Sequence, residues 1–546
     1  MTKLLIIGLD GATFDLITPW AAQGQLPTLA RLMREGVTGN LESTLPPVTS
    51  PAWPTFMTGK NPGKHGVFDF IRPRAGSFDM VNASQIHGQL LWEILSDAGY
   101  SVGVLNVPIT YPPRPVNGYL IPGLLSPDQG QTTYPADLLK PYAAELGKYR
   151  LTPNVQCTPG HEADFIADLH DLIDTQLRYA LRLMRDQPTD VLMLHFLATD
   201  NGSHALWRFM DKTHPRYEAA LAAQYGDALL KIYQHLDAAI AQIHSSLVTH
   251  HSSLIIMSDH GFGPLHRTIN LNILFIEKGL MRLQPGFFTQ VRWWAFRHGL
   301  TPATAYKILS KLGLQNITAQ VSRKARNGAV GKFLSFEDVD WSRTVAYSMG
   351  HVGQVYLNLQ GREPHGIVTP DRYQAARQQV IDALNTLIDP ATGQPLVDRI
   401  IPREDAAHGP YADQGADLHL ILDGYRTIAF PLFATEGRVL TPQIRGDSGC
   451  HRRHGIFIGQ GAAFEPGANI DGARLIDLAP TILRLLNVPV PADMDGRVLT
   501  AALSANLRGQ STQVGAAATA TPTPVDFTAA EQAEVEERLR ALGYLG

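Results

Sequence analysis

The chain has 546 residues, 44% of them hydrophobic, so it can bury a large core in one large α/β fold or in two to four domains. Its formal net charge of −4 gives no sign of the basic surface that a nucleic-acid polymer requires. Two cysteines, Cys157 and Cys450, exclude a disulfide framework and favour a reducing, cytoplasmic location.

The first expected element is a buried strand at Leu4–Leu9. A single lysine precedes it, and Asp10-Gly11 follows where a signal peptide would have small residues, so we do not interpret it as a leader. The sequence contains no run of about eighteen apolar residues, and we therefore expect no membrane span.

Short apolar runs bounded by turn residues predict further strands along the chain. They lie at Val102–Val107, Val191–Leu197, Leu254–Met257, Leu418–Leu422 and Ile456–Ile458. Helical patterns occupy Thr28–Glu35, Leu90–Ala98, Phe165–Arg185 and Tyr217–Leu247. Fully apolar strands alternating with helices predict an α/β fold with a mostly parallel central sheet flanked by helices.

The pattern changes at about Leu271, where apolar residues recur at roughly helical spacing with Gly and Pro breaks. We expect an inserted helical cap at 271–333 that divides the core into a first part, 1–270, and a second part, 334–503. Within the second part the sequence predicts strands around 344–359 and a helix at Tyr373–Leu387.

The C-terminal region begins with residues 504–526, which are rich in Ala, Thr, Gln and Pro and predict a flexible linker. A final helix is expected within 527–546, because Thr528 followed by Glu531 forms a capping-box pattern. This helix is expected to dock through its leucines, Leu539, Leu542 and Leu545.

Four motifs place Asp or His at or beside the end of an expected strand, and the carboxyl ends of parallel strands meet in one crevice. The residues are Asp10 in "LLIIGLDG", Asp200 and His204 in "LMLHFLATDNGSH", Asp259 and His260 in "LIIMSDHG", and His451 and His454 in "GDSGCHRRHGIFIG". Taken alone, Asp10 is more typical of a turn or a helix cap. The Asp259-His260 pair favours metal ligation, because an ordinary turn prefers Asp-Gly or Asn-Gly.

Six ligands, with His451 preferred to His454, make two sites of three, and open coordination positions are typical of catalytic metals. Two ions about 4 Å apart clamp the attacking and leaving oxygens of an in-line displacement. Thr49 in "PPVTSPAWPTFMTG" is the natural nucleophile, since its hydroxyl is expected at a helix N-terminus that favours phosphate.

The ordered set "GLDGATFD", "PPVTSPAWPTFMTGKNPGKHG", "TDNGSH", "SDHG", "SGCHRRHGIFI" and "LIDLAPTILRLLNVPVPADMDGR" resembles the alkaline phosphatase superfamily. Within it the chain resembles the type I phosphodiesterase/nucleotide pyrophosphatase branch, over nearly its whole length. The closing "RLRALGYL" is similar to members described only as phosphohydrolases or phosphomutases.

The resemblance implies a metal-dependent phosphohydrolase with two divalent ions, zinc preferred and manganese the alternative. It assigns one ion to Asp200, His204 and His451, and the other to Asp10, Asp259, His260 and the Thr49 hydroxyl. It also implies that Thr49 attacks phosphorus to form a phospho-threonine intermediate, which water then hydrolyses.

Some residues differ from the superfamily patterns, and these differences narrow the classes of reaction that we expect. Trp53 stands where sulfatases have an arginine, which argues against a sulfatase. Asp69 lies near the place of an asparagine that binds a phosphoryl oxygen in nucleotide pyrophosphatases. No substrate-binding residue is assigned, and we interpret the nearby cationic side chains as surface charges: Lys60, Lys64, His266 and Arg267.

The sequence therefore predicts a phosphohydrolase that cleaves phosphodiester or pyrophosphate bonds of a small phosphate-containing substrate. A phosphomonoesterase or phosphomutase is the enzymatic alternative, and a degenerate metal-binding protein of the same fold is the non-enzymatic one. A third alternative is phosphoryl transfer to a lipid head group or glycan, as membrane-anchored relatives carry out. The exact substrate, the metal identity and the oligomeric state stay open.

Overall fold

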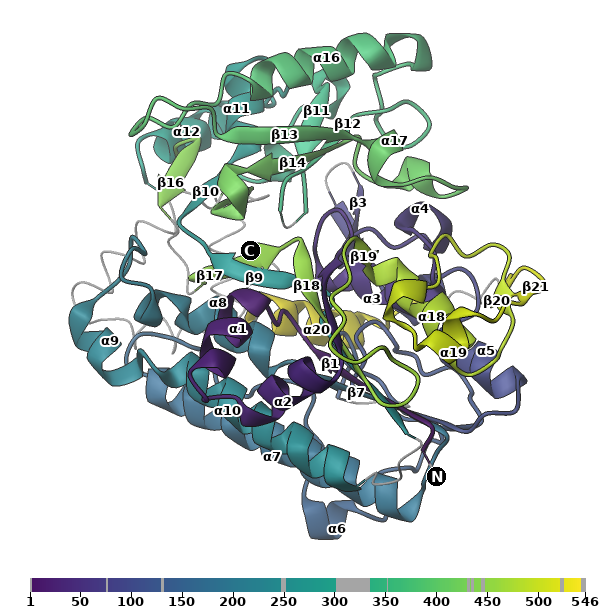
Figure 1. Cartoon of the computed structure of the whole chain (residues 1–546). Coiled ribbons are helices and arrows are strands. Elements are labelled where there is room, and N and C mark those ends of the chain that lie inside the picture. The colour runs from purple at the N-terminus through teal and green to yellow at the C-terminus, as the bar shows by residue number, and fades with distance from the viewer. Residues whose placement is uncertain are drawn as a thin grey trace.

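The computed structural model describes residues 2–541 except 75–76, 129–131, 247–251, 301–333, 351, 430–432, 434–436, 443–446 and 521–524. An eight-stranded sheet forms its centre, in the order β19-β2-β18-β8-β1-β7-β5-β6 (Figure 1). These strands are β1 (Leu4–Leu9), β2 (Val37–Glu42), β5 (Val102–Leu105), β6 (Gly118–Ile121), β7 (Val191–Phe196), β8 (Ser253–Met257), β18 (His454–Gln460) and β19 (Ala473–Arg474). Only β18 runs against its neighbours, so the expected mostly parallel sheet is confirmed.

Strand β1 divides its side chains between two hydrophobic cores because successive strand residues point to opposite faces. Leu5 and Ile7 pack into one core with helices that cover one face of the sheet, and Leu4 and Ile6 pack into the other. The first group of helices is α1 (Phe14–Ala22), α2 (Pro27–Glu35), α7 (Glu162–Asp186), α8 (Ala198–Met210) and α10 (Ala228–Ser246). The second is α3 (Thr49–Thr58), α5 (Leu91–Asp97) and α18 (Leu478–Leu485).

The expected strand at Leu418–Leu422 lies outside the main sheet. It forms β14, which pairs with β12 (Gln354–Leu357) and β13 (Val397–Pro402) in a separate four-stranded sheet completed by β11 (Ala346–Ser348). Helices α11 (Leu271–Glu277), α12 (Phe287–Arg297), α16 (Tyr373–Leu384) and α17 (Arg403–Ala406) accompany this sheet. Together they form a second lobe, drawn above the main sheet in Figure 1. The domain boundaries expected from the sequence remain a prediction.

The C-terminal region folds back onto the main lobe. Val514–Gly515 forms β21 beside β20 (Val490–Pro491), within the stretch expected to be a linker. Helix α20 (Ala529–Ala541) begins with the expected capping box, in which Glu531 N–H donates to Thr528 Oγ1 and Thr528 N–H donates to the Glu531 carboxylate. Leu539 is buried as expected, whereas Leu542 and Leu545 lie outside the described residues.

Short elements complete the described chain. They are α4 (Pro62–His65), β3 (Ile71–Arg74), β4 (Ser77–Met80), α6 (Ala143–Leu146), α9 (Ala219–Tyr225), β9 (Gly261–Pro264), β10 (Arg267–Ile269), β15 (Thr427–Ala429), β16 (Leu440–Pro442), β17 (Gly449–Arg452) and α19 (Ala505–Arg508). No helix among the described residues has both the length and the apolar character that crossing a bilayer requires.

Candidate metal centre

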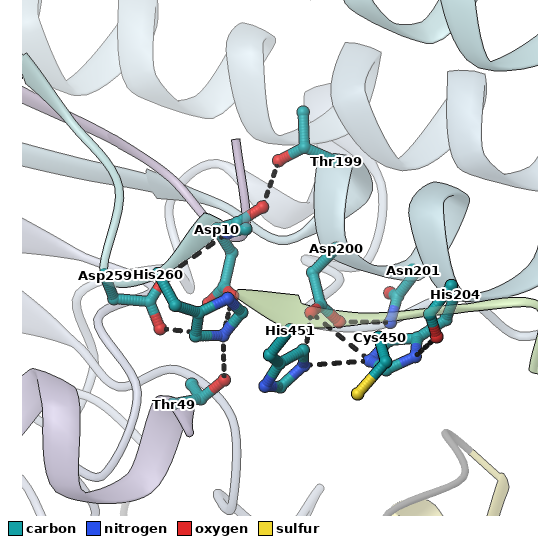
Figure 2. Close-up of polar contacts among 12 residues, drawn as sticks. Asp10, Thr49, Thr199, Asp200, Asn201, His204, Asp259, His260, Cys450 and His451 are labelled. Carbon is teal, nitrogen blue, oxygen red and sulfur yellow. Dashed lines mark hydrogen bonds and ion pairs between the residues drawn. The ribbon is translucent and has the colours of Figure 1, made fainter. Parts of the chain in front are cut away.

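Three buried aspartates meet at the carboxyl edge of the main sheet. Asp10 directly follows β1, Asp200 lies in the first turn of α8 after β7, and Asp259 lies two residues beyond β8. Strands β8, β1 and β7 are direct neighbours, so the three carboxylates converge as parallel strands require. Figure 2 shows all three facing the same small region.

The first group of ligands is Asp200, His204 and His451. His204 lies one helical turn after Asp200 on α8, and His451 comes from β17. The His204 and His451 Nε2 atoms are 3.0 Å apart and lie 3.5 and 3.3 Å from Asp200 Oδ1. Tetrahedral ligands at zinc distances are about 3.3 Å from one another, so this spacing fits one ion.

The second group is Asp10, Asp259 and His260. His260 Nε2 lies 3.6 Å from Asp10 Oδ1 and 3.3 Å from Asp259 Oδ2. The Thr49 hydroxyl is 3.2 Å from the same nitrogen, which gives this group a fourth oxygen at the same spacing. The imidazole rings of His260 and His451 stack with centroids 3.7 Å apart, so the two ligand groups lie in direct contact.

Thr49 is the first residue of α3 and is fully buried. Val48 before it is extended, so the helix begins at the position that the sequence predicts. The first N–H groups of a helix have no intrahelical acceptors, and together with the helix dipole they favour an anion near the N-terminus. The Thr49 hydroxyl therefore lies beside the second ligand group and at a helix end that favours anions.

Each of the three histidines places its Nδ1 against a backbone carbonyl. These contacts join His204 to Gly449 at 3.1 Å, His451 to Pro47 at 2.9 Å and His260 to Gly261 at 3.2 Å. With Nδ1–H donating, the Nε2 lone pair points into the cluster, as is usual for metal-ligating histidines. Burial lowers the pKa of His260 to about 4 and that of His451 to about 3, so both rings are neutral at pH 7.

The electrostatics of the three buried carboxylates favour a bound cation. Burial, together with the neighbouring Asp259 charge, raises the pKa of Asp10 well above its ordinary value, and burial raises the pKa of Asp259 to about 7. For Asp200, burial is outweighed by His204 and His451, which lower its pKa. Among the described residues, Asp10 Oδ1 and Asp259 Oδ2 accept no hydrogen bond. Buried oxygens of this kind need a positive partner, which fits divalent ions at both groups.

The sequence analysis missed His195, although it lies within the motif that contains Asp200. His195 is a lone polar residue inside the apolar strand β7, and that position was the available signal. Its Nε2–H donates to Asp10 Oδ2 at 2.8 Å, and Trp53 Nε1–H donates to the same oxygen at 3.4 Å. These bonds leave Asp10 Oδ1 to face His260.

Three other side chains from the sequence motifs belong to neither group of metal-type ligands. His454, the alternative to His451, is exposed and belongs to neither group. Cys450 is buried, and burial raises the pKa of its thiol to about 11. Asp69 accepts a hydrogen bond from Gln354 Nε2 at 2.7 Å, so this carboxylate links the main lobe to β12.

Three of the four side chains that we interpreted as surface charges form ion pairs instead, and His266 is the exception among the described residues. Lys60 is buried and pairs with Asp493 at 2.5 Å. Arg267 reaches Asp389 and Asp423, both at 2.7 Å. Lys64 likewise pairs with an acidic residue, Asp495. These pairs hold distant parts of the chain together, and the interpretation as solvated surface charges is wrong for Lys60.

Comparison with known proteins decides the family. A model of the type I phosphodiesterase / nucleotide pyrophosphatase family matches residues 4–456. The chain belongs to this family. It is therefore a hydrolase acting on phosphate esters, the family is metal-dependent, and the two ligand groups supply candidate metal positions.

Solved structures of ectonucleotide pyrophosphatase / phosphodiesterase 5 are similar to this chain. The murine protein covers 92% of this chain and 100% of its own, with a TM-score of 0.50 and 13% identity, which shows the shared fold. An inactive murine variant in complex with AMP has a TM-score of 0.49 at 13% identity. The match covers 89% of this chain and 96% of that variant. The human protein has a TM-score of 0.47 at 14% identity, and the match covers 89% of this chain and 95% of the human one. No curated protein matches the chain by sequence.

Proposed function

We propose that this chain cleaves phosphodiester or pyrophosphate bonds at a two-metal site through a phospho-threonine intermediate on Thr49. The observation that carries the proposal is the position of the Thr49 hydroxyl. It lies 3.2 Å from His260 Nε2, against one group of metal-type ligands and beside the second. A buried hydroxyl at a helix N-terminus, next to two such groups, suits nucleophilic attack on phosphorus.

The residues present fit two divalent ions. Asp200, His204 and His451 would hold one, and Asp10, Asp259, His260 and the Thr49 oxygen would hold the other. Mixed imidazole and carboxylate ligands suit zinc, with manganese as the alternative. When bound, the two ions would lower the pKa of the attacking hydroxyl and neutralise charge that develops on the phosphoryl oxygens.

The protein's own part of the reaction begins with positioning. Helix α3 holds the Thr49 oxygen in place, and its first N–H groups face the site of an incoming phosphate. A bond forms between Thr49 Oγ1 and phosphorus as the bond to the leaving oxygen breaks, and the leaving alcohol or phosphate takes up the hydroxyl proton. Water then attacks phosphorus, and the bond between phosphorus and Thr49 Oγ1 breaks. One proton of the water restores the Thr49 hydroxyl, and the other stays with the released phosphate group.

Thr49 is the residue whose replacement tests this proposal most directly. We expect Thr49→Val, which keeps the shape but removes the oxygen, to lower kcat by about 10³-fold or more. Thr49→Ser keeps a hydroxyl and should retain a measurable fraction of the rate. Turnover of bis-p-nitrophenyl phosphate and metal content per chain would be measured for each variant.

Thr58→Ala provides a matched control on the same helix, since the Thr58 hydroxyl bonds the carbonyl of Pro54 and is not among the metal-type ligands. It should keep both turnover and metal. A Thr49→Val protein with wild-type turnover would exclude Thr49 as the nucleophile. Loss of turnover together with loss of both ions would assign Thr49 a role in metal binding alone.

The phosphomonoesterase or phosphomutase alternative separates from the diesterase by substrate preference. A diesterase should have the higher kcat/KM for bis-p-nitrophenyl phosphate than for p-nitrophenyl phosphate, and a monoesterase the reverse. A mutase would return the phosphoryl group to a second hydroxyl and release little phosphate. A small phosphate-containing substrate and a cytoplasmic location complete the proposal.

A further inference from the structure

Helix α12 in the second lobe exposes an apolar face to solvent. Its buried residues, Thr289 and Phe296, attach the helix to the lobe. The outward residues at i, i+4 and i+7 are Phe287, Val291 and Trp294, with exposed fractions of 76%, 45% and 56%. Phe288 beside them is 77% exposed, and Leu300 just beyond the helix is 57% exposed. Figure 1 shows α12 at the outer edge of the lobe.

Exposed apolar side chains are more concentrated here than on the rest of the described surface. Eight large hydrophobic side chains are strongly exposed among the described residues, and five of them lie between Phe287 and Leu300. The other three, Ile388, Val514 and Val525, come from separate parts of the sequence. Single exposed apolar residues are common, whereas a contiguous aromatic cluster marks a surface that binds something.

The sequence that contains this helix is rich in basic residues. The sequence from Lys278 to Phe336 contains ten Lys and Arg residues and no Asp or Glu, in a chain of formal net charge −4. Arg292 and Arg297 pair with Asp338 and Glu277, at the two ends of this stretch. Lys278 and Arg282 are exposed and enter no ion pair within the described part of the chain.

We propose that the outward face of α12, made of Phe287, Phe288, Val291, Trp294 and Leu300, docks on an anionic lipid bilayer surface. Phenylalanine and tryptophan on one side of a helix, with basic residues close by, are the composition of helices that lie in the membrane interface. Anionic head groups would attract Lys278 and Arg282, and the apolar side chains would enter the boundary between head groups and acyl chains.

A second copy of the chain is the less suitable occupant. Two α12 faces brought together would bring the exposed Lys278 and Arg282 of one copy toward those of the other, and like charges disfavour such contacts. A bilayer surface of opposite charge has no such cost. Docking would be peripheral, because no described helix is suited to span a bilayer.

Vesicle flotation with the full chain tests the proposal. The wild-type protein should float with vesicles of phosphatidylcholine containing about 30% phosphatidylserine and bind pure phosphatidylcholine at least tenfold more weakly. Raising the salt from about 0.1 M to 0.5 M should weaken binding severalfold, since screening shortens the reach of the charges. Failure of the wild-type protein to float with the anionic vesicles would overturn the proposal.

Three substitutions made together, Phe287→Ser, Phe288→Ser and Trp294→Ser, should lower binding to the anionic vesicles at least tenfold. The matched control replaces the three other exposed residues, with Ile388→Ser, Val514→Ser and Val525→Ser, and should bind as the wild-type protein does. Circular dichroism and Tm verify that each variant is folded. Equal binding by both triple variants would exclude α12 as the docking surface.

Trp294 reports the depth of docking directly. Brominated lipids should quench part of the tryptophan fluorescence of the bound wild-type protein, and Trp294→Phe should lose most of that quenching while still binding. Sedimentation addresses the competing occupant: a wild-type dimer that the α12 triple substitution converts to monomer would show that the face binds a second copy instead.

Discussion

Asp10 divides its two carboxylate oxygens between two roles. Oδ2 receives hydrogen bonds from His195 and Trp53, and Oδ1 faces His260 without a hydrogen-bond donor among the described residues. The backbone carbonyl of Asp10 also accepts from the Thr199 hydroxyl at 2.6 Å, which fixes the turn after β1. The buried contacts therefore orient the carboxylate before any ion binds.

Replacement of His195 should weaken metal binding at one position. We expect His195→Phe, which removes the donor to Asp10 Oδ2, to lower the affinity for one of two ions by about 10- to 100-fold. His195→Gln keeps a side-chain N–H and should restore part of the affinity. Metal content per chain after dialysis against a competing chelator measures the effect.

His419→Phe is the matched control, because His419 is also a buried histidine with a pKa lowered by burial to about 4, but lies on β14 in the second lobe. It should leave both metal affinities unchanged. Wild-type affinity for both ions in His195→Phe would mean that the remaining contacts orient Asp10 sufficiently.

The short helix α4 illustrates how an element can depend on one neutral side chain. It ends at His65, whose Nε2–H donates to the Thr55 hydroxyl at 2.9 Å and whose Nδ1 accepts the Val67 N–H at 3.2 Å. Protonation would place an N–H at Nδ1 against the N–H of Val67. Burial is the main cause that lowers the pKa of His65 to about 3.

This arrangement makes a prediction about acid stability. The unfolded chain takes up a proton on His65 near pH 6.5, and the folded chain does so only near pH 3. The stabilisation is therefore complete above pH 6.5 and is lost as pH falls, by about 1.4 kcal/mol per pH unit. We expect His65→Gln, which cannot titrate, to reduce the pH slope of the free energy of unfolding by about one proton between pH 6 and pH 4.

Urea unfolding at a series of pH values measures that slope for both proteins. Asn154→Gln, a substitution in a non-titrating residue, should leave the slope unchanged and serves as the control. An identical slope in His65→Gln and wild type would show that the folded protein protonates His65 as readily as the unfolded chain does.

Two examples show how far local sequence signals predict the ends of a helix. The single helix expected at Tyr217–Leu247 is divided into α9 and α10, with Gly226 as the residue that ends α9. Glycine lowers helix propensity by about 1 kcal/mol relative to alanine, so a long periodic pattern can break there. The capping box at Thr528 lies entirely within one turn, and it was therefore predictable.

At the scale of the whole molecule, the segment after α3 joins the two lobes. Asn61 Oδ1 accepts the His408 N–H at 3.0 Å, and Gly63 O accepts the Tyr411 N–H at 2.8 Å. The Asp69 bond to Gln354 adds a third link. The helix that carries Thr49 is thus followed directly by the contacts that hold the second lobe.

Gly63→Ala should loosen this junction. A Cβ at Gly63 would lie 2.6 Å from the carbonyl oxygen of His408, so one backbone must move away. We expect a loss of about 1 to 3 kcal/mol and faster proteolysis within residues 403–417. Tm and limited proteolysis with mass spectrometry measure the two effects.

Gly509→Ala is the control, because the nearest atom to its new Cβ would be at 3.8 Å. Its Tm and its cleavage pattern should match those of the wild-type protein. If Gly63→Ala also matched, the contact between α4 and the second lobe would not be close-packed in solution.

The sequence by itself determined the α/β class, strands β1, β7 and β8, and the aspartates that follow them. These features depend on local apolar runs and on turn residues next to them, which a single stretch of chain contains. The resemblance to the phosphodiesterase family added the grouping of the seven site residues, since ordered motifs carry more information than any one of them.

Tertiary structure alone decided which residues support the site. The pairing of His195 with Asp10 joins positions 185 residues apart, and Lys60 reaches Asp493 across 433 residues. The placement of β14 in a second sheet depends on hydrogen bonds to β12 and β13 that no local pattern encodes. Partner choice over such separations follows from packing of the whole chain, because burial leaves each polar group only the partners that the fold brings to it.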